Sequence, residues 1–524
     1  MARIGFVSCN CPGITRTAGR SVCQARLAAR LPPIHTRADS ATEHPRVEAG
    51  PGRRLRRARR IIASDHTEQV PRPRLATRAY SWSSFGRPKT PTATTCLQTG
   101  AQIGDLRKAS PMIWQVNEIV NPPVDKPRLG RVHWPNAYGD PMLLTRDRLE
   151  QIEDLALAPY GMHSRDSRGR AYAEEEPTHR TAFQRDRDRV LHTTAFRRLE
   201  YKTQVFIIHE GDYYRTRLTH TLEVAQIGRT VARALGANED LVEAICLAHD
   251  LGHPPFGHSG ERALGGLMKG HSGFDHNKQS MRIVTELERR YASFPGLNLT
   301  WEVREGIVKH ETEYDVADAQ DYDPDKRGNL EAQIANAADE LAYTAHDLDD
   351  GLRSGLLRPA QLPDLLVWQR LQESLAWKGD EVDELTRHRL IRRLIGLEVT
   401  DLIQTTSAQL DQSGVASADA LQRLPHNVIA FSDPYQAMNR QLRTFLYENM
   451  YQHHRVVRMQ VKAERIVEDL FRAYTATPLI LSREVQERAR SAGLERAVCD
   501  YIAGMTDRFA LQEHDRLFDP STRP

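Results

Sequence analysis

Helical periodicity dominates the last two thirds of this chain and limits what it can fold into. Beyond about Gly169, apolar residues return at steps that place them on one face of a helix, and no segment alternates apolar and polar residues as a strand does. The clearest set, at steps of four to five residues, is Leu218, Leu222, Ile227, Val231 and Leu235. The pattern predicts an all-α fold without internal repeats.

Two further helices follow from the same spacing. The first carries Leu241, Ala244, Ile245 and Ala248 and precedes a Gly/Pro-rich break at Gly252–Gly257. The second carries Ile334, Ala338, Leu341 and Ala345, and Gly351 can end it at the C-cap. Charged amphipathic segments continue from 362 to 511, whereas residues 112–169 are broken by Pro and hold one short helical stretch around 149–157.

These changes of pattern divide the chain into four parts. Residues 1–111 form a basic extension that we expect to be disordered, and residues 112–180 form a loop-rich lead segment. Residues 181–360 form a helical core that carries the chemistry described below. Residues 361–524 form a C-terminal helical region, which we expect to complete the pocket or a subunit interface.

Charge is unevenly distributed between these parts. Residues 1–110 hold 20 Lys and Arg against 6 Asp and Glu, a net charge of +14, and the remainder holds 52 against 63, a net charge of −11. The overall charge of +3 therefore describes neither part, and it does not by itself indicate nucleic-acid binding.

Three interpretations of the basic extension stay open: an organelle transit peptide, an arm that binds nucleic acid or anionic lipid weakly, and an over-long reading of the gene. We favour the last, because organised sequence begins abruptly at Met112 with MIWQVNEIV.

Two classes of protein are excluded. No window approaches the roughly 18 uninterrupted apolar residues of a membrane span, so we expect no membrane insertion. Six Cys, four of them in the first fifth of the chain, give neither a disulfide scaffold nor zinc-ribbon spacing and suit a reducing cytoplasm.

The densest chemistry lies in Ala248–Glu261, AHDLGHPPFGHSGE. A lone His-Asp pair is usually an ordinary surface or cap pair, but here His249 and Asp250 end an apolar helix beside further titratable groups. One imidazole nitrogen and one carboxylate oxygen suit a divalent cation such as Mn, Mg, Fe, Ni, Co or Zn. His220 and Asp339, on neighbouring predicted helices, complete a proposed set of four ligands.

Five sequence words in order resemble a known family. They are FRRLEYKTQVF (196–206), YRTRLTHTLEVAQIGR (214–229), HDLGHPPFGHSGE (249–261), GFDHNKQSMRIV (273–284) and ANAADELAYTAHDLDDGL (335–352). Together with the H…HD…D order of the proposed ligands, they resemble the deoxyguanosine triphosphate triphosphohydrolases among the HD-domain phosphohydrolases. The resemblance runs from about Thr181 to Leu352 and more weakly to Met459, and it does not include residues 1–110.

The resemblance implies metal-dependent hydrolysis of a dNTP, dGTP or dNTPs in general, to deoxynucleoside and tripolyphosphate. It gives His253 and Glu261 the catalytic role, with Glu261 orienting His253 or the attacking water. His276 is a further candidate, able to protonate the leaving 5′ oxygen, although a capping or structural role for it stays open. The family also implies a homo-oligomer.

The candidate substrate-binding residues lie near these motifs. Arg217 shares a helix face with His220 and can reach the α- or β-phosphate. Lys202, with Arg197 and Arg198, is a candidate for the triphosphate tail, each with a solvated role as the alternative. The resemblance places Tyr343 beside the sugar and Asp347 near its 3′ hydroxyl, and Gln204 is a candidate for the sugar or base. His271, His310 and His346 are expected to support the site or to be structural.

Two rival functions remain. One is another HD-domain phosphohydrolase, such as a phosphodiesterase or (p)ppGpp hydrolase, which the absence of an HHE…GYP word for cyclic dinucleotides disfavours. The other is a nucleic-acid-binding regulator that uses the core as a nucleotide sensor and binds the nucleic acid through the basic extension. A pure sensor does not require both His253 and Glu261 beside intact metal ligands, so we favour the enzyme.

Overall fold

The computed structural model describes residues 143–204, 214–310, 321–377 and 382–523, and every regular element within them is a helix. Besides the helices, these residues form three isolated bridges, one of which joins Thr203 to Thr216. The predicted all-α fold is therefore confirmed. The interpretations of residues 1–110 lie outside the described residues.

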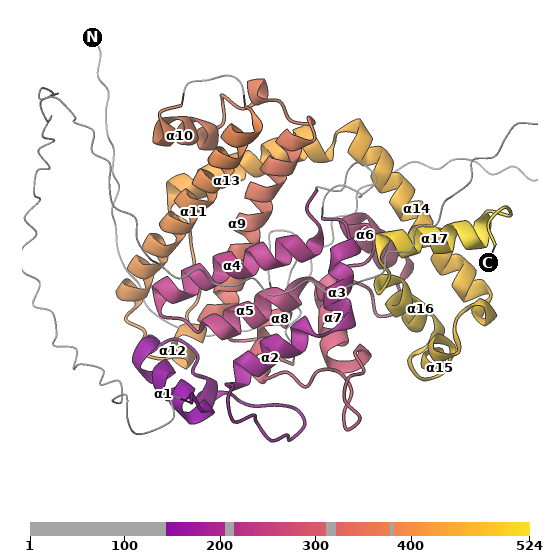
Figure 1. Ribbon diagram of the computed structural model, residues 1–524, viewed down its shortest axis with the longest axis horizontal. Coiled ribbons are helices and arrows are strands. Elements are labelled where there is room, and N and C mark those ends of the chain that lie inside the picture. The colour runs from indigo at the N-terminus through magenta and orange to yellow at the C-terminus, as the bar shows by residue number, and fades with distance from the viewer. Residues whose placement is uncertain (1–142, 205–213, 311–320, 378–381, 524) are drawn as a thin grey trace, which may run out of the picture. The chain divides into compact units, whose positions relative to one another are not determined.

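Nine α-helices precede the C-terminal region. They are α1 (Arg146–Ala156), α2 (Ala182–Leu191), α3 (Thr194–Arg198), α4 (Arg217–Leu235), α5 (Glu239–Ala248), α6 (Gly257–Leu267), α7 (His276–Arg282), α8 (Trp301–Val308) and α9 (Leu330–Arg353) among the described residues. Figure 1 shows α9 crossing behind α4 and α5. These three helices pack against one another, and α2 and α8 pack against α5, so the main apolar core lies among them.

Helix α4 matches its prediction except at one position. Thr216 caps its first turn and Gly236, with a φ of 71°, ends it. Ile227, Val231 and Leu235 are buried as predicted, but Leu222 is 47% exposed, so its assignment to the buried face was wrong. The buried face passes through Gly228 instead, where a Cβ atom would lie 2.8 Å from Val242 Cγ1 and would push α5 away.

Helix α9 is longer than predicted. It continues through Gly351 to Arg353, so the prediction that Gly351 ends the helix was wrong. Gly351 is required by packing and not by a cap, because a Cβ atom there would lie 2.5 Å from Leu357 Cδ1 and 3.1 Å from Met450 Sδ.

The C-terminal region is also helical. Its helices are α10 (Leu366–Leu375), α11 (Glu384–Ser413), α12 (Ala418–Gln422), α13 (Asp433–Leu446), α14 (His454–Ala476), α15 (Arg483–Ala492), α16 (Leu494–Ala503) and α17 (Asp507–Phe518). Helices α11 and α13 pack on α9, while α14 packs along α6. Residues of α6 and α14–α17 build a second apolar core, which we call the C-terminal cluster, and Phe256 belongs to it.

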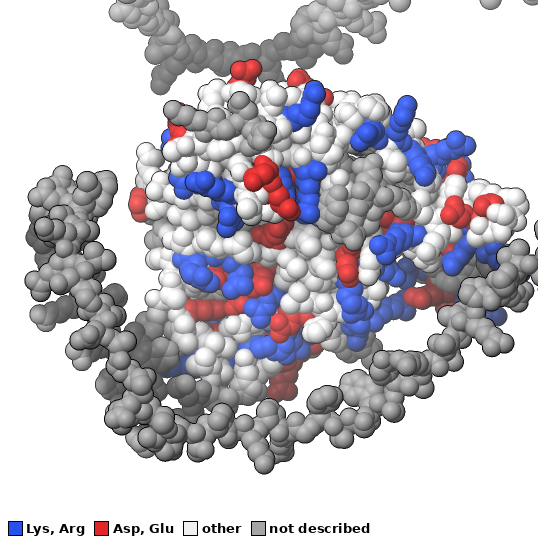
Figure 2. Space-filling model, turned by 45° about the horizontal axis from the view of Figure 1, so that its top comes forward, with Lys and Arg blue, Asp and Glu red and all other residues white. Residues whose placement is uncertain are grey.

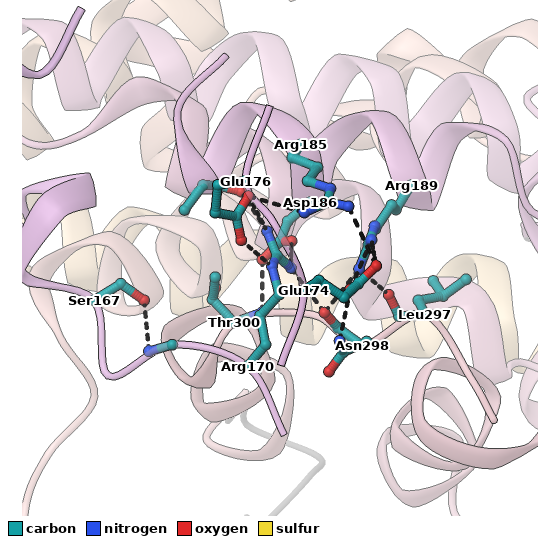
Figure 3. Close-up of polar contacts among 12 residues, drawn as sticks. Ser167, Arg170, Glu174, Glu176, Arg185, Asp186, Arg189, Leu297, Asn298 and Thr300 are labelled. Carbon is teal, nitrogen blue, oxygen red and sulfur yellow. Dashed lines mark hydrogen bonds and ion pairs between the residues drawn. The ribbon is translucent and has the colours of Figure 1, made fainter. Parts of the chain in front are cut away.

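Buried charges fasten the lead segment to the core (Figure 3). Arg170 pairs with Glu176 and with the fully buried Asp186 of α2, and its guanidinium donates to the Asn298 carbonyl at 2.7 Å. Asp186 also accepts from the Thr300 amide at 2.7 Å. Because each buried charge has a partner, the network can hold this loop without an apolar core of its own.

The surface carries mixed charge. On the face that Figure 2 shows, acidic and basic side chains are interspersed, so the acidic excess does not form a single field there. No described helix combines the length and the low polarity that crossing a bilayer would require.

Candidate active site

The four predicted metal ligands converge from three segments. His220 comes from α4, His249 and Asp250 from the 3₁₀ turn His249–Gly252 that follows α5, and Asp339 from α9. His220 Nε2 lies 2.9 Å from Asp339 Oδ1, and His249 Nε2 lies 3.6 Å from the same oxygen and 3.5 Å from Asp250 Oδ1. Crossing of α4, α5 and α9 therefore gathers two imidazoles and two carboxylates around one point.

The tautomer of His249 fits a metal ligand. Its Nδ1 lies 2.6 Å from the Cys246 carbonyl, which can only accept, so Nδ1 carries a proton and Nε2 is the nitrogen that can present a lone pair to a metal. Nε2 is buried and has no hydrogen-bond partner among the described residues, although two carboxylates face it. A divalent cation would satisfy this nitrogen and both carboxylates together, so the residues present fit such a group.

Charges in the site are strongly coupled. Burial by itself lowers the pKa of His249, but Asp250 and Asp339 raise it to about 9. Burial by itself would raise the pKa of both carboxyl groups. Arg217 and His249 nevertheless hold the pKa of Asp250 well below the usual range. His249 and His220 do the same for the pKa of Asp339. Both carboxylates are thus ionised, and a bound cation would replace the proton on His249.

His310 lies closer to the site than predicted. Its Nε2 is 3.5 Å from Asp339 Oδ2, and donor atoms of His249, His310 and Asp339 all lie within 4.8 Å of one another. His310 therefore adds an imidazole within reach of the cation. It follows α8 without any neighbouring motif, so the sequence held no signal to separate it from a structural histidine.

His346 supports a ligand from behind, as expected. Its Nδ1 lies 3.4 Å from His220 Nδ1, and its Nε2 lies 3.2 Å from Glu223 Oε2. Arg215 donates to the same glutamate oxygen at 2.9 Å. A proton on His346 Nε2 and another on His220 Nδ1 would satisfy this series of hydrogen bonds and leave His220 Nε2 for the metal.

A second histidine cluster adjoins the metal ligands. His276 Nδ1 donates to Glu261 Oε1 at 2.8 Å, and His258 Nδ1 lies 3.1 Å from Glu261 Oε2. The His253 ring stacks on His276 with centroids 3.9 Å apart. Glu261 therefore contacts His276 directly, and donor atoms of His253, Glu261 and His276 lie within 4.8 Å of one another. That Glu261 orients His253 or the attacking water stays a prediction.

His253 is held in a proton-accepting form. It is buried, and burial together with Arg217 and His276 lowers its pKa well below the ordinary value. Its Nδ1 lies 2.9 Å from Asp250 Oδ1 without hydrogen-bond alignment, and neither ring nitrogen has a hydrogen-bond partner in the described part of the chain. Hydrogen bonds from His258 and His276 overcome the effect of burial on Glu261 and keep its pKa far below the usual range.

A pocket lies over both clusters. Its lining is Gln204, Arg217, His220, His249, Asp250, His253, His258, His276, His310, Asp339, Glu340, Tyr343, Thr344 and Arg443. Arg217 donates to both oxygens of Asp250 at 3.0 Å, while its Nε has no partner among the described groups. Gln204, Arg217 and Tyr343 thus line the pocket, and their contacts with substrate stay predictions.

Asp347 and Lys202 do not line this pocket. Asp347 lies one turn beyond Tyr343, where burial and then Asp350 raise its pKa well above the usual value, and its contact with a 3′ hydroxyl stays a prediction. Lys202 donates to the backbone carbonyls of His253 and Ala503, and burial lowers its pKa to about 7. Its predicted contact with a triphosphate tail is corrected, because its ammonium group is used inside the protein.

The C-terminal region contributes to the pocket, one of the two roles expected of it, but the individual residues were not predicted. Arg443 of α13 lines it and pairs with Glu340 of α9. Tyr451 donates its hydroxyl proton to Tyr343 at 2.7 Å. Arg443 is one of several arginines in an amphipathic stretch, so only the packing of α13 on α9 reveals it.

Family comparisons agree with this geometry. Residues 217–344, which include all four proposed ligands, match the HD domain, and residues 429–516 match the phosphohydrolase-associated domain. The protein is an HD-domain phosphohydrolase, a class that acts through a metal ion held by His and Asp.

Similar chains narrow the assignment. This chain is 52% identical over 370 residues to a deoxyguanosinetriphosphate triphosphohydrolase-like protein of Geobacter metallireducens. The alignment covers 70% of this chain and 96% of the relative. A protein of the same description from Geobacter sulfurreducens is 50% identical, and the alignment covers 73% of this chain and 100% of the relative. Another from Ralstonia pickettii is also 50% identical, over 69% of this chain and 94% of the relative. The chain belongs to the deoxyguanosinetriphosphate triphosphohydrolase-like family.

Proposed function

We propose that this enzyme hydrolyses deoxynucleoside triphosphates, dGTP or dNTPs in general, to deoxynucleoside and tripolyphosphate. The observation that carries the proposal is the juxtaposition, in one pocket, of a metal-ligand set and a separate histidine cluster held by Glu261. Similarity to the deoxyguanosinetriphosphate triphosphohydrolase-like proteins supports the substrate class.

His220, His249, Asp250 and Asp339 would hold the divalent cation, which when bound draws electron density from the α-phosphate. Arg217 is placed to bind a phosphate oxygen through the side of its guanidinium that faces away from Asp250. In the reaction, water adds to the α-phosphorus and the bond between that phosphorus and the 5′ oxygen breaks.

Two protons must move in this reaction, and the second cluster can move them. Neutral His253 can accept a proton from the attacking water, and the leaving 5′ oxygen must gain one, for which His276 is the candidate. Glu261, bonded to His276 Nδ1, fixes the ring that stacks on His253. Tyr343, hydrogen-bonded to Tyr451 and Asp347, is placed to border the sugar.

The test is product analysis. The purified full chain is incubated with each of the four dNTPs and Mn²⁺ or Mg²⁺, and chromatography separates nucleoside, nucleotide and polyphosphate products. We expect deoxynucleoside and tripolyphosphate in equal amounts. Release of pyrophosphate with a nucleoside monophosphate, or of orthophosphate alone, would replace this proposal with another phosphohydrolase reaction.

A further inference from the structure

We infer that Asp507, at the start of α17, is a positioning residue for the catalytic loop His253–Phe256. This inference rests on the proposed function, because it gives the C-terminal region a task in the reaction assigned to His253. Asp507 is 2% exposed and does not line the pocket, so it acts through the loop and not on substrate.

Asp507 bonds two segments of the active-site wall at once. One carboxylate oxygen accepts from the Phe256 amide at 2.9 Å. The other accepts from the Thr203 amide at 2.9 Å and from the Thr203 hydroxyl. Thr203 precedes Gln204, which lines the pocket. A single buried carboxylate therefore joins the catalytic loop to the segment that carries a predicted substrate contact.

Lys202 ties the other end of the same loop. Its ammonium group donates to the His253 carbonyl and, at 3.0 Å, to the Ala503 carbonyl at the end of α16. The first and last residues of the catalytic loop are thus both tethered to residues 503–507, one through Lys202 and one directly. This double attachment fixes the position of the His253 backbone relative to the C-terminal region.

Backbone conformation shows why the loop needs these attachments. Phe256 has a φ of 65°, a left-handed conformation that a residue with a side chain adopts only when its surroundings impose it. Its amide is bonded to Asp507, and its ring is buried in the C-terminal cluster. Phe256 also precedes α6, which carries Glu261, so its conformation sets the position of that carboxylate as well.

The metal-binding turn is anchored independently. Ser280 of α7 donates its hydroxyl proton to the His249 carbonyl at 2.7 Å and accepts from the Gly252 amide at 2.8 Å. No bond of Asp507 reaches this turn among the contacts of the described residues. Loss of the Asp507 carboxylate should therefore displace His253 from His276 while the metal ligands stay in place.

The experiment compares Asp507→Asn and Asp507→Ala with the wild-type full chain. An amide presents only one accepting oxygen to groups that are all donors, so Asp507→Asn should also be impaired. We expect kcat to fall by roughly 10- to 100-fold, as for a displacement of about 1 Å at a catalytic group. KM should rise by a smaller factor, because Asp507 also holds Thr203 beside Gln204. The dissociation constant for Mn²⁺, measured by calorimetry without substrate, should change less than about threefold.

Two controls separate positioning from stability. Asp515→Asn removes an exposed carboxyl from the same helix, and Val485→Ala weakens the C-terminal cluster without removing a bond to the loop. Neither should change kcat at a temperature well below its Tm. A fall in kcat for Val485→Ala equal to that for Asp507→Ala, or loss of Mn²⁺ affinity in the Asp507 variants, would overturn the inference.

Amide hydrogen exchange in residues 253–257 tests the inference without any substrate. Exchange should rise in Asp507→Ala and stay unchanged in both controls, and unchanged exchange in Asp507→Ala would overturn the inference. If the wild-type protein hydrolyses no dNTP, the proposed function fails. In that case, amide hydrogen exchange, together with kcat for hydrolysis of the generic phosphodiester bis-p-nitrophenyl phosphate, decides whether Asp507 positions the loop.

Discussion

Asp250 combines two roles in one carboxylate. It faces His249 Nε2, where it is a proposed metal ligand, and it accepts from Arg217 at 3.0 Å through both oxygens. Asp250→Ala would therefore remove a ligand and leave Arg217 buried without its partner, and both effects oppose metal binding. We expect elemental analysis to find almost no bound metal and hydrolysis to be abolished. Asp147→Ala, at an exposed position, is the control, and full metal occupancy in Asp250→Ala would remove Asp250 from the ligand set.

His253 separates catalysis from metal binding. Its ring stacks on His276 beside the ligands. We expect His253→Ala to keep the metal and to lose turnover by roughly 10²- to 10⁴-fold, the usual contribution of a general acid or base. Metal content and kcat measured on one preparation check this. Loss of metal would make His253 a ligand, and unchanged turnover would leave it without a catalytic role.

Glu398 on α11 is an acid without a partner. It is 1% exposed, and neither carboxyl oxygen has a hydrogen-bond partner among the described residues. Burial, and to a smaller extent the negative charge of Glu340, raises its pKa to about 8, although Arg443 acts in the opposite direction. The folded protein thus keeps a proton that the unfolded chain releases near pH 4.5. Stability should therefore fall between about pH 5 and 8, by up to about 1.4 kcal/mol per pH unit, and level off above that range.

Glu398→Gln removes this dependence. The free energy of unfolding of the variant minus that of the wild type should increase from pH 5 to 8, as urea titrations at each pH can show. Glu384→Gln, exposed on the same helix, should show no such trend. A difference that stays constant from pH 5 to 9 would show that Glu398 titrates normally.

At the scale of elements, the break between α5 and α6 depends on the close approach of its backbone to α7. A Cβ atom on Gly252 would lie 2.2 Å from the His276 carbonyl oxygen and 2.3 Å from the Ser280 amide nitrogen, and backbone cannot yield as a side chain can. Gly252→Ala should therefore displace α7 and weaken Mn²⁺ binding. Gly266→Ala on α6 meets nothing within 4 Å and should be neutral or stabilise by up to about 1 kcal/mol. Calorimetry and thermal unfolding of both variants compare them directly.

Helices were predictable where periodicity and burial coincide. Ile227, Val231 and Leu235 lie on the buried face of α4, within the main apolar core that it forms with α5 and α9. Leu222 and Gly351 were assigned wrongly for a common reason: the sequence does not state which helix approaches a given face. Gly228 allows the close approach of α5, and Gly351 allows that of Leu357. Local sequence cannot distinguish a glycine required by packing from one that caps a helix.

At the scale of the whole molecule, the convergence of the proposed metal ligands was predictable because their motifs carry the His and Asp residues locally. The four ligands converge and Arg217 and Tyr343 line the pocket. The contributions of Arg443, Tyr451 and Asp507 were not predictable, because each reaches the site through packing of helices distant in sequence. Lys202 was misplaced for the same reason: its partner Ala503 lies about three hundred residues away.

Every contact that builds the site lies beyond residue 180, whereas residues 1–110 carry a net charge of +14. A chain that starts at Met112 should therefore fold, bind Mn²⁺ and hydrolyse dNTPs as well as the full chain. We expect only weaker and salt-sensitive binding to polyanions, because removing clustered arginines removes counterion release. kcat/KM at matched ionic strength, thermal unfolding and a salt titration of DNA binding compare the two chains. Insolubility of the shorter chain, or a loss of more than about tenfold in kcat/KM, roughly 1.4 kcal/mol of transition-state stabilisation, would make the extension part of the working enzyme.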